Sequence, residues 1–183
     1  MIESLIVIIV LTVAIVWIFN LLVKDRNQML AAWSDIDVQL KRRHELIPQL
    51  VTTVKAYADF EKATMTAVTV LRSRSKIESH LPEKSAIETE MGTAINQLII
   101  LAEDYPDLKA DGNFRKLQTE LTEIEDHIQY SRRFYNGAVR IFNTRVESFP
   151  NSIIAGLFSF KIAEYFEVNS VDERKSSIVD LSD

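Results

Sequence analysis

The pattern of apolar and polar residues separates one continuous apolar run from a series of amphipathic segments. Residues 5–23 read LIVIIVLTVAIVWIFNLLV, with 17 apolar positions of 19 and no formal charge. This is about the length that a helix needs to cross the hydrocarbon core of a bilayer. Its Leu, Ile, Val and Phe residues together favour insertion by about 6 kcal/mol as an upper figure. The run therefore predicts a membrane-spanning helix.

The residues that flank this run indicate an anchor that stays on the chain. A cleaved signal peptide, the alternative, has a basic start, a shorter apolar run and small residues at its cleavage site. Here Glu3 lies in the start, and Lys24 and Asp25 follow the run. We therefore expect residues 1–23 to form an uncleaved transmembrane anchor.

Positive charge beside the span predicts its orientation. Lys24 and Arg26 follow the span, whereas residues 1–4 carry no Lys or Arg. Because cytoplasmic flanks are enriched in Lys and Arg, we expect the rest of the chain on the cytoplasmic side. A soluble part on the exported side is the alternative.

A helical stripe follows the span. No Gly or Pro precedes Pro48, so we expect the membrane helix to continue unbroken into a stalk. Pro48 lacks a backbone donor and clashes with the preceding turn, which predicts a kink or a local break. The stripe of this first helix alternates steps of three and four, a spacing suited to antiparallel packing: Trp33, Ile36, Leu40, His44, Ile47, Val51, Val54, Ala58, Glu61, Met65 and Val68.

The next segments contain clear start and stop signals. Pro82 suits the first turn of a second helix, which we expect to run to about Glu103. Residues 103–114 contain Pro106 and an Asp-Gly pair, which are typical of turns. Asn113 at the end of this segment is the expected N-cap of a third helix.

The third helix has the most regular pattern and is expected to end at Pro150. A helix of this length is marginal alone, so it must pack against the first helix. Residues 151–166 predict a short Phe-rich helix, and residues 167–183 a flexible acidic tail. The stripe of the third helix is Phe114, Leu117, Leu121, Ile124, Ile128, Ser131, Tyr135, Val139, Phe142, Val146 and Phe149.

Together these elements predict an all-α protein. Its N-terminal transmembrane helix is followed by an elongated antiparallel four-helix-type bundle over residues 24–166.

Composition removes several classes of function. The 183 residues include no Cys, which excludes disulfides and thiolate chemistry. A formal net charge of -5 without a basic stripe argues against nucleic-acid binding. The four Gly are too scattered for a phosphate loop or a nucleophile elbow. We therefore expect no enzymatic activity and no cofactor.

Two polar residues lie on the apolar stripe of the first helix. A di-iron bundle needs two Glu-x-x-His motifs, and none of the three His follows a Glu at that spacing. We therefore predict no metal site of that type. His44 and Glu61 favour a polar layer that sets helix register. A site for a metal or a small ligand around these two residues is the alternative.

The stretch AWSDIDVQLKRRHELIP, residues 32–48, is unusually rich in charge. Lys41 lies four residues from both Asp37 and Glu45, so surface ion pairs explain much of this charge. The functional alternative is a partner-docking face formed by Asp35, Asp37, Arg42, Arg43 and His44.

The third helix repeats aromatic and amide residues every seven positions. Tyr135, Phe142 and Phe149 lie beside Asn136 and Asn143, a pattern more typical of a register or contact device than of a ligand site. We also expect basic residues of this helix to pair with acids of the first helix: Arg132, Arg133, Arg140 and Arg145.

The Phe-rich segment after Pro150 raises the question of membrane binding, because Phe158, Phe160 and Phe166 suit an interface. Counting three long helices places Phe149 at the end of the bundle far from the membrane. We therefore expect this segment to fold back on the bundle or to contact a partner.

Four blocks of the sequence resemble the bacterial LemA family: AWSDIDVQLKRRHELIPQLV, EDYPDLKADGNF, RRFYNGAVRIFNTRVESFP and AEYFEV. They occur in the family's order, after an N-terminal membrane span, and the resemblance extends over nearly the whole chain. The resemblance implies a long helical bundle tethered to the bacterial inner membrane, without an established enzymatic activity. The family context also implies a membrane metalloprotease system as a partner. Ser159 departs from the Gly that the family pattern predicts, which affects a local turn.

We conclude from the sequence that the chain is a membrane-anchored scaffold or adaptor that acts through protein contacts. Its expected partners are the bilayer through residues 5–23, other proteins, and further copies of itself. A small-ligand or metal sensor around His44 and Glu61 is the alternative function.

Overall fold

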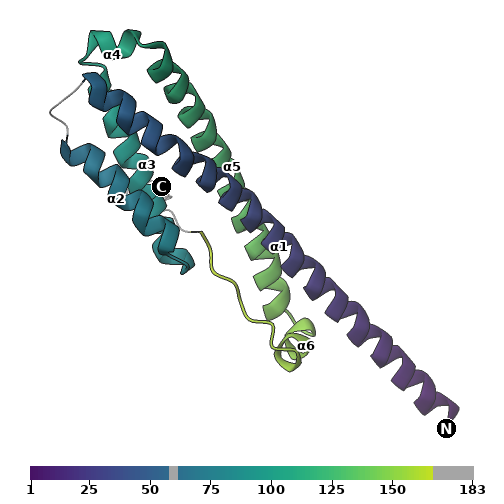
Figure 1. The fold of residues 1–183 in the computed structure, drawn as a ribbon. Coiled ribbons are helices and arrows are strands. Elements are labelled where there is room, and N and C mark those ends of the chain that lie inside the picture. The colour runs from purple at the N-terminus through teal and green to yellow at the C-terminus, as the bar shows by residue number, and fades with distance from the viewer. Residues whose placement is uncertain (58–61, 167–183) are drawn as a thin grey trace, which may run out of the picture. The chain divides into compact units, whose positions relative to one another are not determined.

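The computed structural model describes residues 1–57 and 62–166, and these residues contain helices and no strand. The predicted all-α class is confirmed. The chain forms two compact units, which together contain six helices within the described residues (Figure 1). These are α1 (Ile2–Tyr57), α2 (Lys62–Ile77), α3 (Leu81–Ala102), α4 (Pro106–Ala110), α5 (Gly112–Glu147) and α6 (Asn151–Leu157).

Unit 1 comprises residues 1–43 and 121–165. Here the first part of α1 lies against the second part of α5. Asp25 pairs with Arg145, the rings of Trp33 and Tyr135 lie 5.7 Å apart, and Arg43 pairs with Glu125. Residue numbers on α5 fall as those on α1 rise, so the two helices are antiparallel within this unit, as the sequence predicts.

The predicted apolar positions of α5 are buried, with an exception at the end of the pattern. Nine of its eleven positions are buried and Ser131 is half-buried. Phe149 lies beyond the last residue of α5 and is 82% exposed. The seven-residue repeat therefore fails at Phe149, because the helix that would carry the repeat has already ended.

Unit 2 comprises residues 44–120 together with Phe166 among the described residues of the C-terminal end. It contains the last turns of α1, then α2, α3, α4 and the first turns of α5. α2 returns along α1, because the Arg72 side chain reaches the backbone of His44. The prediction of one helix through Val68 is therefore wrong, since α1 ends at Tyr57.

Pro48 lies inside α1 without ending it, so of the predicted kink or local break, the break does not occur. In a regular helix the N–H of residue 48 would bind the carbonyl of His44, and proline has no N–H. The Arg72 Nε of α2 donates to this carbonyl instead, at 2.7 Å. A side chain from the neighbouring helix thus replaces the missing backbone hydrogen bond.

This replacement predicts an energetic coupling between Pro48 and Arg72. Arg72→Met removes the donor but keeps an apolar stem, and should cost about 1–3 kcal/mol because the His44 carbonyl loses its partner. The same substitution in a Pro48→Ala background should cost less, since the alanine N–H can bind that carbonyl. Urea unfolding of the four proteins of this double-mutant cycle measures the difference, and purely additive effects would contradict the coupling.

The third long helix that the sequence predicts is α5; it begins two residues earlier than predicted, and its cap is Asp111 rather than Asn113. The Asp111 Oδ1 accepts the backbone N–H groups of Asn113 and Phe114 at 2.8 and 2.9 Å. The Tyr57 hydroxyl donates to the Asp111 Oδ2 at 3.0 Å. One carboxylate therefore caps α5 and joins it to the end of α1 within unit 2.

These contacts predict an acid-dependent stability. The Phe114 N–H bond and the Tyr57 hydroxyl lower the pKa of Asp111, and the same carboxylate raises the pKa of Tyr57. A depressed carboxyl pKa stabilises the fold above the unfolded value of about 3.9, and this stabilisation disappears as the pH falls through the folded pKa. Asp111→Asn keeps a capping oxygen but cannot titrate. Its melting temperature should fall less than the wild-type value between pH 6 and pH 3; superimposable circular-dichroism profiles would contradict the assignment.

The first turns of α1 present an apolar surface on every side. All residues from Met1 to Trp17 are exposed, and the most apolar window of α1 has a mean hydropathy of 3.0 and is 11% buried. A helix in the core of a soluble protein would bury most of such a surface. α1 is the one described helix that is long and apolar enough to cross a membrane.

Candidate functional site

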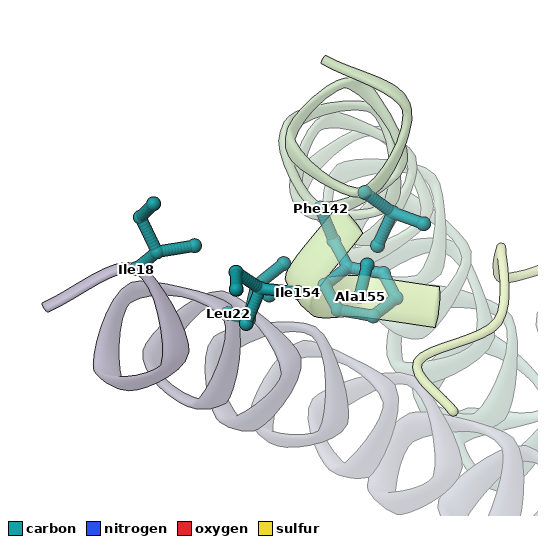
Figure 2. Close-up of a cluster of buried hydrophobic side chains, with 6 residues drawn as sticks. Ile18, Leu22, Phe142, Ile154 and Ala155 are labelled. Atoms are coloured by element: carbon teal, nitrogen blue, oxygen red, sulfur yellow. The ribbon is translucent and has the colours of Figure 1, made fainter. Parts of the chain in front are cut away.

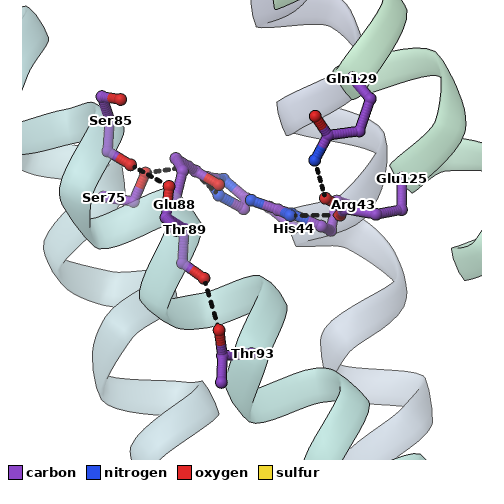
Figure 3. A network of polar contacts seen from close by, with 9 residues as sticks. All are labelled: Arg43, His44, Ser75, Ser85, Glu88, Thr89, Thr93, Glu125 and Gln129. Atoms are coloured by element: carbon purple, nitrogen blue, oxygen red, sulfur yellow. Dashed lines mark hydrogen bonds and ion pairs between the residues drawn. The ribbon is translucent and has the colours of Figure 1, made fainter. Parts of the chain in front are cut away.

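The polar centre of unit 2 joins three helices at one carboxylate (Figure 3). His44 of α1 lies with its Nε2 at 2.8 Å from the Oε1 of Glu88 on α3. The Ser75 hydroxyl of α2 donates to the same oxygen. Glu88 and Ser75 are fully buried and His44 is 6% exposed. A misplaced register of any of the three helices would leave a buried polar group without its partner.

This centre has the chemistry of a register device. The Ser75 hydroxyl donates to the Glu88 carboxylate rather than to the His44 imidazole, so these three side chains do not have the Ser-to-His-to-acid order of a catalytic triad. Across the described residues, no group of three or more His, Cys, Asp or Glu side chains is arranged to hold a metal ion. A buried, mutually satisfied layer of this kind specifies which helix faces meet.

The acid of this layer is Glu88, whereas the stripe of the first helix predicts Glu61. Glu61 lies outside the described residues, so its place as a register residue stays a prediction. A sequence signal for Glu88 did exist. It lies on the buried stripe of α3, which continues at steps of three and four: Glu88, Met91, Ile95, Leu98 and Ala102.

The candidate docking face divides into buried and accessible residues. Arg43 is 1% exposed and donates to Glu125 of α5 at 2.7 Å (Figure 3). His44 is buried in the polar centre of unit 2. These two side chains therefore do not belong to an exposed face, because each is committed to packing within its own unit.

The remaining members of that face are accessible. Asp35 and Arg42 are exposed, and Asp37 is half-buried. Lys41 pairs with Asp37 at 2.6 Å, as the helix spacing predicted. Such a surface pair contributes only a few tenths of a kcal/mol. Docking through these residues stays a prediction.

The aromatic and amide residues of α5 hold the chain segment that follows α6. Asn143 donates from Nδ2 to the Ala163 carbonyl at 2.9 Å and accepts the Ala163 N–H at 2.8 Å. The Tyr135 hydroxyl donates to the Glu164 carbonyl at 3.0 Å. Burial raises the pKa of Tyr135. Asn136, one heptad before Asn143, is half-buried. Asn143 thus fixes a backbone, which the heptad pattern alone did not indicate.

An apolar cluster in unit 1 joins α6 to the end of the predicted span (Figure 2). Its buried members are Ile18, Leu22, Phe142, Val146, Ile154 and Ala155. Beside it, Arg145 and the buried Asp25 form the ion pair between α5 and α1 that the sequence predicted. The segment after Pro150 therefore does fold back on the helices of its unit.

The predicted position of that segment is wrong. It was expected at the end of the bundle far from the membrane, but Ile154 packs against Ile18 and Leu22, inside the apolar run 5–23. The reason is the additional reversal between α1 and α2. As a result α5 runs antiparallel to α1 within unit 1, and its last turns lie against the span.

The turn after α6 places Ser159 in a backbone conformation that favours glycine. Phe160 donates its N–H to the Ala155 carbonyl at 2.9 Å, a closure typical of a helix C-terminus. Ser159 has a φ of 57°, in the left-handed region that favours glycine. The family pattern of Gly at this position thus matches the backbone that the chain adopts.

One exposed face of α5 is apolar and aromatic. Tyr130, Phe134 and Ile141 are 67%, 47% and 48% exposed. Gly137 lies between Phe134 and Ile141, and the four residues follow one another at steps of four, three and four. They therefore share one helix face. A Cβ added at Gly137 would meet nothing within 4 Å. We call these four residues the α5 stripe.

Comparison with known proteins identifies the family. The model of the LemA family matches residues 32–180, which is most of the chain. The chain belongs to the LemA family. The match begins in the amphipathic part of α1 and extends past α6, so the family pattern covers both units.

Curated relatives support this membership. Protein LemA of Metamycoplasma hominis is 28% identical over 163 residues, covering 87% of this chain and 74% of the relative. Magnetosome protein MamQ of Magnetospirillum gryphiswaldense is 24% identical, covering 81% of this chain and 64% of the relative. Magnetosome protein MamQ 2 of Paramagnetospirillum magneticum is 33% identical over 76 residues, which is 28% of its length. These names state no enzymatic activity.

Family membership and the apolar first turns of α1 together define the coarse class. The chain is a membrane-associated helical protein with a single candidate span among its described residues.

Proposed function

We propose that this LemA-family protein is a membrane-anchored scaffold or adaptor that acts through protein contacts and does not catalyse a reaction. α1 anchors the chain in the bacterial inner membrane, and the helical part that follows the span lies on the cytoplasmic side. Lys24 and Arg26 beside the span support this orientation. The partners are proteins, including further copies of this chain and, from the family context, a membrane metalloprotease system.

The α5 stripe is the observation that carries this proposal. An exposed row of large apolar side chains is typical of a surface that another helix covers. Gly137 within the row allows a partner helix to approach the backbone closely, as small residues do at helix interfaces. Several buried polar residues are bonded within their own unit, which suits a rigid support more than a reactive site: Asp25, His44, Ser75, Glu88 and Asn143.

The test is extraction of the full-length protein in native nanodiscs, followed by mass photometry and mass spectrometry of the bound proteins. Phe134→Glu places a charge in the α5 stripe. Thr119→Glu adds the same charge at an exposed residue of α5 outside the α5 stripe and is the matched control. The wild type and the control should give one defined assembly that Phe134→Glu loses. A wild-type monomer without bound protein would contradict the scaffold.

A further inference from the structure

The exposed apolar residues of the segment 149–162 lie beside the membrane-spanning part of α1. Ile154 and Ala155 face the buried cluster with Ile18 and Leu22. The other side of this segment is exposed, with Ile153 at 61% and Leu157 at 71%. The exposed set is Phe149, Ile153, Leu157, Phe158 and Ile162.

The length of the apolar run places this segment at the boundary of the bilayer. The exposed residues 2–17 of α1 cover about 24 Å at 1.5 Å per residue. The hydrocarbon core is about 30 Å thick, so it extends to the level of Ile18 and Leu22. Since α6 packs on these two residues, α6 lies at the same level, between hydrocarbon and headgroups.

Aromatic contacts fix the next residues at this level. The ring of Phe19, within the span, lies 4.8 Å from Phe158 and 5.8 Å from Phe160. The guanidinium of Arg26 lies 5.4 Å from the centre of the Phe160 ring. Aromatic rings beside a cationic group at the end of a span are typical of the interfacial zone.

The charge of the segment suits lipid headgroups. From Ser148 to Ala163 the only charged residue is Lys161. Apolar side chains with a positive flank are the composition of elements that lie in a membrane interface. Water would meet these exposed apolar side chains unfavourably, whereas the acyl chains beside the span cover them without a further protein.

We propose that α6 and residues 158–162 form a second lipid contact. Their exposed apolar side chains insert into the membrane interface on the side where α1 emerges from the bilayer after Leu22. A three-helix topology would keep this segment far from the membrane and argue against lipid contact, but α6 packs on the span itself. The proposal rests on the membrane crossing of α1. Its consequence is that unit 1 is fixed to the bilayer at two points, which restricts its tilt.

The absence of cysteine makes the proposal directly testable. Single-cysteine variants Leu157→Cys and Ile153→Cys of the full-length chain carry a nitroxide label in nanodiscs of phosphatidylcholine and phosphatidylglycerol. Power saturation compares accessibility to oxygen, which concentrates in lipid, with accessibility to a water-soluble nickel chelate. Val10→Cys in the span and the exposed Asp126→Cys on α5 are the lipid and water references.

The expected oxygen-to-nickel ratio of both labels is several-fold above that of Asp126→Cys and close to that of Val10→Cys. A ratio equal to that of Asp126→Cys would overturn the proposal. Low accessibility to both reagents would also overturn it, since protein would then cover the segment. A water-like Val10→Cys label would refute the membrane crossing itself, so failure of the anchor is distinguishable from failure of the second contact.

Discussion

Replacing Glu88 by alanine is expected to lower the free energy of unfolding of unit 2 by about 3–5 kcal/mol, the cost of breaking a buried polar pair. His44 and Ser75 both use the Glu88 Oε1, and both lose their partner at once. Because whole domains are stable by only about 5–15 kcal/mol, this loss is a large share of the total. Hydrogen exchange of α2 and α3 amides in the full-length protein measures the change.

Two matched variants separate the polar contacts from the loss of volume. Glu88→Gln keeps the shape and one acceptor oxygen, and should retain most of the stability. His44→Leu with Glu88→Met replaces the pair by apolar groups and should be less damaging than Glu88→Ala alone. If the α2 and α3 amides of Glu88→Ala exchanged at the wild-type rate, the polar centre would have no role in holding the three helices together.

Replacing Phe142 by alanine should release α6 from unit 1. Phe142 is 2% exposed and lies at the centre of the cluster that joins Ile154 to Ile18 and Leu22. A buried Phe→Ala change costs about 3–5 kcal/mol through lost contacts and the remaining cavity. We expect hydrogen exchange to accelerate in α6 and in the segment that Asn143 binds, while α2 and α3 in unit 2 stay at the wild-type rate.

Phe134→Ala is the control, because Phe134 lies on the same helix but is half-exposed and outside the cluster. It should change the exchange of α6 amides little. Equal acceleration by both variants would show that any loss of side-chain volume on α5 loosens the segment, and would remove the special role of the cluster.

The buried faces of the two longest helices, α1 and α5, were predictable because burial along a helix repeats with the geometry of the backbone. On α5, Ile128, Val139 and Phe142 are buried where the three-and-four spacing places them. On α1, Ile36, Leu40 and Ile47 follow the same rule. Periodicity of this kind is a local property, so one sequence suffices to predict which face is buried.

The reversal between α1 and α2 was not predictable from that spacing. The apolar stripe keeps the same helical spacing on both sides of the reversal, at Val54 before it and at Met65 and Val68 after it. The pattern therefore predicts a single helix. A stripe shows which face is buried but carries no information about the direction in which the chain returns. The misplaced Phe-rich segment follows from this one missed reversal.

For the candidate site residues, too, the sequence predicted burial on a helix face but not the partner on another helix. The burial of His44 followed from its place on a stripe, but its partner Glu88 lies on another helix, 44 residues away along the chain. Arg43 lies one residue from His44 and is an exposed charge by composition alone, yet Glu125 holds it in a buried position. Sequence spacing cannot assign partners of this kind, because they depend on the register between helices.

By itself, the sequence determined that this chain is helical, that residues 5–23 suit a bilayer, and which faces of its long helices are apolar. These properties depend on hydrophobicity and on a helical period that the backbone fixes locally. Only the tertiary structure decided how often the chain reverses, which acid meets His44, and that α6 packs on the end of the span. Those outcomes depend on contacts between distant segments, whose free energy is gained only when the helices lie side by side.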